Sequence, residues 1–424
     1  MRLKKVVVQN FRGIEYIELD LDDQLNILIG ENGSGKTVIL EALTVAVGAF
    51  MIGLRDVSTR GIRDDDVRYT VQQEYAYPVV IEANGIIDGQ RVSWSRERHS
   101  KTGSTNYKNA QPISQIAQTM DDRVRSGEYV DLPLISYFST GRLFVEAQSQ
   151  QKKQPTARNG KKELGSRFRG YRESLDAKSS FRRFVDWFEL KELSQLQKKE
   201  TDPSLFMVKQ AIRKNLPNCK DVFYDFDPDT NRGLTVALTD GRTLPFEYLS
   251  DGVRNFFAMM ADIAHRCVLL NPHLQEKALA QTEGIVLIDE LDLHLHPSWQ
   301  KSVIRSLTET FPKIQFVVTT HSPFLIQETE ANQLIVLEDC KVKQTGSGNN
   351  LSLEDIAEEL QGFVNPRWSN KREALYEIGK KYYTAVAEGS TADNIEEEMT
   401  QAEKDFTEDT LFYAYLEALK AMKQ

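Results

Sequence analysis

The stretch LNILIGENGSGKT, residues 25–37, decides the fold of this 424-residue chain. Residues 25–29 form an apolar run, which predicts a parallel strand buried on both faces. Residues 30–37 fit the pattern G-x-x-x-x-G-K-[ST], whose glycines let backbone N–H groups wrap closely around phosphates. An apolar helix is expected over residues 37–49, which completes the strand, loop and helix that this motif requires.

Each position of the loop has an expected role. Lys36 would place a positive charge between the β- and γ-phosphates of a nucleotide, and the Thr37 hydroxyl would ligate Mg²⁺. ATP and Mg²⁺ are therefore the expected cofactors, and a glycine-rich turn without a ligand is the disfavoured alternative. The predicted nucleotide-binding positions are Gly30, Glu31, Asn32, Gly33, Ser34, Gly35, Lys36 and Thr37.

A second apolar strand, GIVLIDE at residues 284–290, delivers two carboxylates to its C-terminal end. Open α/β sheets bind ligands at that edge. Asp289 would hold Mg²⁺ through its water shell, and Glu290 would orient and deprotonate the attacking water. The alternative is a strand that ends in a solvated acidic turn. For Asp292, a contact across a dimer interface and a helix N-cap are equally weighted.

Two further motifs belong to the same set. Residues 316–322, FVVTTHS, predict another apolar strand, and His321 at its end would contact the γ-phosphate and sense its hydrolysis. Residues 249–254, LSDGVR, open a helix that extends to Leu270. A Ser-x-Gly turn at a helix N-terminus is an anion site, although many helices begin with serine or aspartate as a cap.

The two histidines of HLHPSWQ, His294 and His296, suggest a metal site only weakly, because they stand at i,i+2 spacing and a third ligand is lacking. A helix start with Pro297 in the first turn is the favoured interpretation. Residues 64–66, three successive aspartates, are expected to form a solvated charged turn.

Outside these motifs the chain predicts antiparallel strands and helices. Paired strands are expected around the turn at Gly13, and a β-meander over residues 74–97 turns at Asp88 and Gly89. The side chains Phe181, Phe184, Trp187, Phe188 and Leu190 recur at helical spacing and are expected to pack. The predicted division is residues 1–144 as an N-terminal lobe with the phosphate loop and the meander, 145–220 as a basic linker and helical insertion, 221–345 as a C-terminal lobe with the remaining motifs, and 346–424 as an acidic helical region.

The net charge of −9 hides a basic segment at residues 152–183, which can present a phosphate-binding surface. A flexible solvated insertion is the alternative interpretation of nearly equal weight. The mean hydropathy is below zero, and the three cysteines make no ligand pattern. A cytoplasmic protein without a membrane span is expected.

Taken in order, these motifs resemble those of the ABC-type ATPase heads of the RecF and SMC group, and most closely a compact branch of AAA-type ATPases without the long coiled coil. The resemblance implies a P-loop ABC ATPase head of α/β class: a mixed central sheet, an antiparallel β subdomain, a helical insertion and a C-terminal helical tail. It implies Mg²⁺-dependent ATP hydrolysis with Lys36, Glu290 and His321 as catalytic residues. It also implies that Arg12 approaches the nucleotide phosphates. Ser250 and Gly252 would contact ATP bound to the opposite subunit of a head-to-head dimer or higher oligomer.

The sequence departs from that family pattern at two places. Asp251 stands where many ABC proteins have glycine, which alters the charge close to ATP. No clear Q-loop glutamine is present. Residues 134–142 occupy the corresponding region, and Arg142 is a candidate contact to the γ-phosphate or to a partner.

Relatives of the compact branch resemble the ATPase subunits of anti-phage systems, among them the Septu ATPase PtuA, which works with an HNH nuclease. The resemblance implies a defence ATPase that acts with a separate HNH or other nuclease, with residues 152–183 facing nucleic acid or that partner. Three alternatives remain: a RecF-like repair or loading ATPase, a non-hydrolysing nucleotide sensor, and the nucleotide-binding subunit of a transporter, which the long signature-to-strand spacing disfavours.

Overall fold

The computed structural model describes residues 1–72, 74–143, 167–176, 181–227, 229, 233–362, 377 and 381. The chain divides into two compact units, Met1–Leu353 and Glu354–Gln424. The described strands all belong to the first unit. In the second, the structure describes a short π-helical segment, Ile356–Leu360. The finer four-part division stays a prediction.

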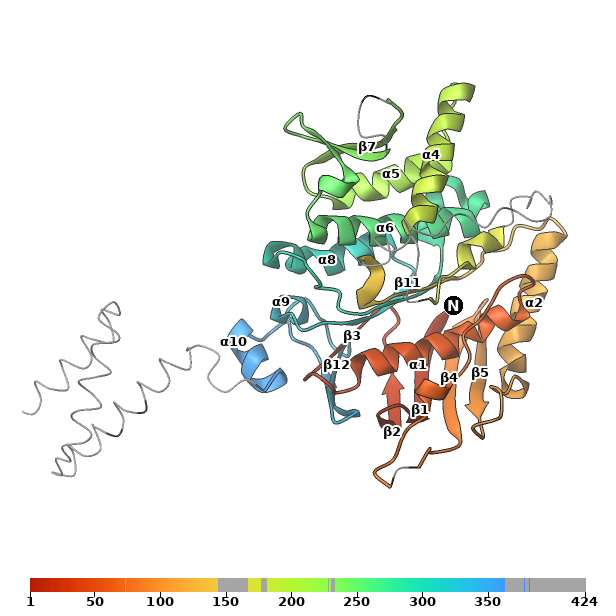
Figure 1. Ribbon diagram of the computed structural model, residues 1–424, viewed down its shortest axis with the longest axis vertical. Helices are drawn as coiled ribbons and strands as arrows, with labels where there is room; N and C mark the ends of the chain where they lie inside the picture. The colour runs from red at the N-terminus through yellow and green to blue at the C-terminus, as the bar shows by residue number, and fades with distance from the viewer. Residues whose placement is uncertain are drawn as a thin grey trace, which may run out of the picture. The chain divides into compact units, whose positions relative to one another are not determined.

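A six-stranded sheet lies at the centre of the first unit (Figure 1). Its strands are parallel except for the edge strand β13, which runs antiparallel to β12. The order across the sheet is β13 (Lys341–Gly346), β12 (Leu334–Glu338), β3 (Leu25–Gly30), β11 (Ile314–Thr319), β10 (Gly284–Ile288) and β6 (Leu134–Phe138). All residues of β11, β10 and β6 are buried, as expected for parallel strands covered on both faces. The predicted buried strand is confirmed as β3.

A four-stranded antiparallel sheet forms the β subdomain, with buried and less buried residues alternating along β4. Its order is β2 (Ile14–Asp20), β1 (Arg2–Phe11), β4 (Val79–Ile87) and β5 (Gln90–Arg98). Helix α1 (Lys36–Gly48) lies between this sheet and the central one and contacts strands of both. Residues 36–53 form the one described segment long and apolar enough to cross a membrane, and most of that segment is buried here.

Figure 1 shows α6 (Asp251–Leu270) and α8 (Pro297–Thr310) on the opposite side of the central sheet from α1. Pro297 begins α8, as predicted, and the His296 side chain caps it. Helices α4 (Phe181–Lys198) and α5 (Pro203–Asn215) pack on α6. A small sheet of β7 (Cys219–Asp225), β8 (Gly233–Leu238) and β9 (Thr243–Pro245) contacts α4 and α5. The shorter helices are α7 (Ala278–Gln281), α9 (Pro323–Ile326) and α10 (Leu353–Asp355).

Two expectations about elements need correction. Helix α2 (Gln111–Arg125) was not predicted, although its buried residues Ile113, Ala117 and Met120 recur at helical spacing. The aromatic side chains of α4 pack as predicted, with Phe184 and Phe188 fully buried, but Leu190 is 66% exposed. The buried face of α4 continues from Phe188 to Glu192 one turn later, so Leu190 lies on the opposite, exposed face of the helix.

Candidate active site

The phosphate loop joins β3 to α1 through glycines in conformations that other residues rarely adopt. Gly30, Gly33 and Gly35 have φ values of 147°, 86° and 97°. A Cβ atom at Gly30 would lie 2.3 Å from the carbonyl oxygen of Leu337 on the neighbouring strand β12. The backbone therefore requires glycine here, and it exposes N–H groups that a side chain would cover.

Lys36 begins α1 and folds back over the loop. Its Nζ donates to the carbonyl oxygens of Gly30 at 2.8 Å and Glu31 at 2.9 Å. Burial lowers the pKa of Lys36, while the nearby carboxylates of Asp289 and Glu290 act in the opposite direction. The ammonium is thus held at the loop as a positive charge facing the acidic strand end.

Asp289 lies beside the loop although 252 residues separate it from Thr37. The Thr37 hydroxyl lies 3.0 Å from Asp289 Oδ2 and 3.1 Å from Oδ1. Asp289 is 2% exposed, and strands β3 and β10 reach this point from either side of β11. Carboxylate and hydroxyl oxygens are the ligand types that Mg²⁺ takes in proteins, so this pair of residues fits the expected ion.

Strand β11 brings a third strand end to the same edge. The Thr319 hydroxyl donates to Asp289 Oδ1 at 2.7 Å and accepts the Glu290 N–H at 2.7 Å. His321 follows the strand by two residues and is exposed. The strand ends that carry Lys36, Asp289 and His321 are therefore adjacent, which the separate motifs predicted.

The turn after β10 is linked to the turn after β11. The Thr320 hydroxyl donates to Asp292 Oδ1 at 2.5 Å and accepts the Ser322 N–H at 2.9 Å. The N-cap of α8 is His296, so the prediction of Asp292 as a helix N-cap is wrong. Its carboxylate instead accepts the Thr320 hydroxyl, and Asp292 lies four residues before the N-cap of α8. Contact across a dimer interface stays a prediction.

The first turn of α6 carries the serine-glycine motif. Ser250 occupies the N-cap position without a side-chain hydrogen bond, and it is exposed. Gly252 is buried, and a Cβ atom there would lie 2.2 Å from the carbonyl oxygen of His294. Gly252 therefore has a packing role within the chain that the sequence did not reveal, because it brings α6 against the turn after β10.

Asp251 has a partner on its own helix. Its carboxylate pairs with the Arg254 guanidinium one turn later, and this contact lowers the pKa of Asp251. The charge that departs from the family pattern is thus balanced within the first turn of α6.

The family model described as "AAA domain" matches residues 5–220, just over half of the chain. The chain belongs to the AAA domain family. A second model, "AAA domain, putative AbiEii toxin, Type IV TA system", matches residues 142–327 of this AAA protein. Membership makes the chain an AAA-type ATPase.

Two curated relatives cover most of this AAA protein. The retron Ec83 probable ATPase of Escherichia coli is 27% identical over 398 residues, which are 80% of this chain and 72% of the relative. The Septu protein PtuA of Bacillus thuringiensis is 25% identical over 393 residues, which are 89% of this chain and 88% of the relative. These matches agree with the resemblance to Septu-type and RecF- or SMC-like ATPases.

Among solved structures, an SMC head bound to the C-winged helix domain of ScpA is 18% identical to this AAA protein. It aligns over 84% of this chain and 100% of that one, with a TM-score of 0.48.

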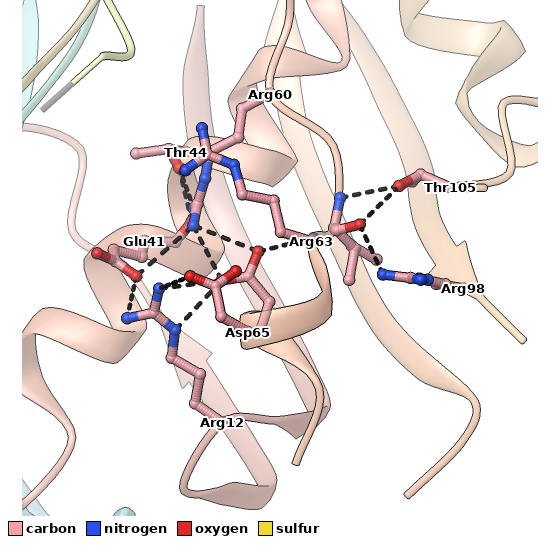
Figure 2. A network of polar contacts seen from close by, with 10 residues as sticks. Arg12, Glu41, Thr44, Arg60, Arg63, Asp65, Arg98 and Thr105 are labelled. Carbon is pink, nitrogen blue, oxygen red and sulfur yellow. Dashed lines mark hydrogen bonds and ion pairs between the residues drawn. The ribbon is translucent and has the colours of Figure 1, made fainter. Parts of the chain in front are cut away.

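Arg12 of the AAA protein lies in the polar network of Figure 2. It forms ion pairs with Glu41 of α1 and, at 3.1 Å, with Asp66. Arg60 contacts Asp66 at 3.0 Å and donates to the Glu41 carbonyl at 2.5 Å. Burial raises the pKa of Glu41 although Arg12 acts in the opposite direction. The contact of Arg12 with a nucleotide stays a prediction, and its guanidinium is held one turn of α1 beyond Thr37.

The network corrects one expectation about the three aspartates. Asp64 and Asp65 are exposed, as expected of a solvated turn, but Asp66 is fully buried. Its partners are Arg12, which is distant in the sequence, and Arg60, which belongs to the same loop. A run of like charges gave no signal that one of its members points inward.

The basic segment is only partly described. The side chain of Arg142 and residues 144–166 and 177–180 lie outside the described residues. Arg167 donates to the carbonyl oxygen of Leu270 at 2.6 Å and to Val130, and burial lowers its pKa. Arg167 therefore fastens the end of α6 and does not belong to an open basic surface.

Cys340 is a further neighbour of the loop that the sequence did not identify. A Cβ atom at Gly35 would lie 3.1 Å from its Sγ, and one at Gly13 would lie 3.3 Å away. The turn between β12 and β13 thus covers the phosphate loop from the side, and no pattern in the sequence signalled that contact.

Proposed function

We propose that this AAA protein hydrolyses ATP at composite sites between two copies of itself and serves as the ATPase of a bacterial anti-phage defence complex with a separate nuclease. The observation that carries the proposal is the contact between Thr37 and Asp289. It joins the phosphate loop to a carboxylate at the end of strand β10, although 252 residues separate the two in the sequence.

The roles of the residues at the sheet edge follow from their chemistry. The backbone of residues 30–35 binds the phosphates, and Lys36 neutralises charge on the β- and γ-phosphates. Thr37 and Asp289 would hold Mg²⁺, which neutralises the charge that develops on the phosphate oxygens. Glu290 orients the attacking water and takes its proton, and His321 contacts the γ-phosphate.

The first turn of α6 supplies the second half of the site in this proposal. Its N-terminus carries the positive end of the helix dipole, and Ser250 is exposed with no side-chain cap bond. Such a turn binds anions. Ser250 and the backbone at Gly252 would close over ATP held by the sister chain, and Arg254 limits repulsion from Asp251.

The defence role rests on the relatives. Names of the form "Retron Ec83 probable ATPase" and "Septu protein PtuA" belong to chains that this one matches over most of its length. The nuclease would be a separate HNH or other protein. The basic residues of the segment 152–183, apart from Arg167, would face nucleic acid or that partner.

The decisive experiment mixes two inactive variants. Lys36→Ala removes the loop charge, and Ser250→Arg blocks the turn that would meet the opposite ATP. Each variant alone is expected to lose Mg²⁺-dependent phosphate release. An equimolar mixture forms heterodimers with one intact site, so activity should return to about a quarter of wild type if the sites act independently.

Two outcomes would contradict the composite site. Either Ser250→Arg alone hydrolyses ATP at the wild-type rate, or the mixture stays inactive while both variants remain folded and dimeric by light scattering. The defence assignment is tested separately by purifying the tagged chain from its host, with Lys161→Glu/Lys162→Glu as the matched variant. Recovery of neither a nuclease nor nucleic acid would remove that part of the proposal.

A further inference from the structure

We propose that Thr319 is a positioning residue that fixes the metal-binding carboxylate and the catalytic turn as one hydrogen-bonded unit. The inference rests on the proposed function, because it concerns the hydrolysis that Asp289 and Glu290 would perform. Thr319 is the last residue of β11, the strand between the phosphate-loop strand β3 and the acidic strand β10.

The Thr319 hydroxyl uses both of its hydrogen-bonding capacities. It donates its proton to Asp289 Oδ1 at 2.7 Å and accepts the backbone N–H of Glu290 at 2.7 Å. The side chain is completely buried, so water does not replace either bond. One hydroxyl therefore joins the side chain of one residue to the backbone of the next.

The backbone of Thr319 adds a third bond to the same turn, since its carbonyl accepts the N–H of Leu291 at 2.9 Å. Glu290 lies between these bonds with φ of 48°, a conformation uncommon for residues other than glycine. Such a backbone persists only where its surroundings hold it. Thr319 supplies that hold, so it sets the direction in which the Glu290 side chain leaves the chain.

The hydroxyl also restricts Asp289. This carboxylate already contacts Thr37, and the Thr319 hydroxyl adds a shorter bond to Oδ1. Partners of this kind orient metal-binding carboxylates, and their loss costs about 10- to 100-fold in metal affinity or activity. Removing the hydroxyl would also leave the Glu290 N–H without its partner.

The test compares Thr319→Val, which keeps the shape and removes the hydroxyl, with Thr319→Ser, which keeps the hydroxyl. In Thr319→Val, we expect kcat to fall by about 10- to 100-fold and the Mg²⁺ concentration for half-maximal turnover to rise by about 10-fold. Thr319→Ser should retain both values within about threefold. Binding of a fluorescent ATP analogue without Mg²⁺ should be equal in all variants, because the loop is untouched.

Thr235→Val is the matched control, since Thr235 is 2% exposed in strand β8 and its hydroxyl donates to Gly233. It should leave turnover and Mg²⁺ dependence unchanged. Where Thr319→Val does not fold, Thr319→Cys makes the same comparison, because a thiol is a much weaker donor.

The proposal is overturned if Thr319→Val keeps the wild-type kcat and Mg²⁺ dependence, or if Thr319→Ser is as impaired as Thr319→Val. Failure of the proposed function has a different signature: the wild-type chain itself releases no phosphate. In that case the Mg²⁺ dependence of analogue binding still decides about Thr319, and equal dependence in wild type and Thr319→Val counts against it.

Discussion

The sheet edge and the first turn of α6 differ in where their polar side chains find partners. At the sheet edge, Lys36 contacts the loop carbonyls, and both Thr37 and Thr319 reach Asp289. At the start of α6, Ser250 is exposed and Asp251 pairs only one turn along the same helix. One half of the site is thus organised within the chain, while the other half turns outward. In the proposed composite site, a single copy would hold the organised half but would need the first turn of α6 from a second copy to enclose the nucleotide.

The largest effect should come from Glu290→Gln at the organised half. The change removes the proposed base and leaves the shape and hydrogen-bonding reach of the side chain similar, so turnover should fall by about 100-fold or more. ATP binding should persist, and phosphate release alongside nucleotide-analogue binding measures both. Glu338→Gln is the control, because Glu338 also ends a strand of the same sheet but pairs with Lys343 at the surface. Equal turnover in wild type and Glu290→Gln would exclude the assigned base.

A smaller effect is expected where the two halves touch. Gly252→Ala would put a methyl group 2.2 Å from the His294 carbonyl. The first turn of α6 must then shift, at a cost of about 1–3 kcal/mol in the free energy of unfolding. Chemical denaturation measures it, with Gly346→Ala as control because a Cβ there meets nothing within 4 Å. An unchanged free energy of unfolding would mean that α6 does not depend on this close approach.

The smallest effect concerns the buried part of α6. Burial lowers the pKa of His265 to about 3, and the ring lies 4.5 Å from that of Trp187. Below about pH 6.5 His265 binds a proton in the unfolded chain but stays neutral in the folded chain. The free energy of unfolding therefore decreases as the pH falls from 6.5 towards 3. His265→Phe should remove about 2 kcal/mol of this loss at about pH 5.

Denaturation curves at neutral and acidic pH check that prediction. Carboxylates contribute equally to wild type and variant, so the difference between their pH dependences isolates His265. His99→Gln provides the control, because this histidine lies at the surface beside Glu97. If wild type and His265→Phe lose stability in parallel as the pH falls, His265 is not held neutral in the folded chain.

The organised half was the more predictable of the two. The loop glycines and Lys36 belong to one continuous motif, and its backbone demands are local, so spacing alone identified them. The strand that ends at Asp289 and the strand before His321 could also be predicted, because parallel strands that are buried on both faces appear in the sequence as apolar runs. Their adjacency followed from the rule that ligands lie at the carboxyl ends of such strands.

What escaped prediction depends on partners that are distant in sequence. Thr319 looks like any threonine in a strand until Asp289 is placed beside it. Asp66 looks solvated until Arg12 and Arg60 converge on it. The packing role of Gly252 requires the position of His294. None of these contacts is encoded by a local pattern, so only the fold reveals them.

The strand order β12-β3-β11 has a consequence for biosynthesis. Strand β3 ends at Gly30, but both strands that flank it lie beyond residue 313. Because synthesis proceeds from the N-terminus, the loop strand leaves the ribosome with both edges open and stays so while hundreds of residues are added. Its apolar side chains and unpaired backbone must be shielded during that interval, by the nascent chain itself or by a chaperone. A chain that ends before β11 would carry the complete glycine-lysine motif but neither of the two strands that flank β3.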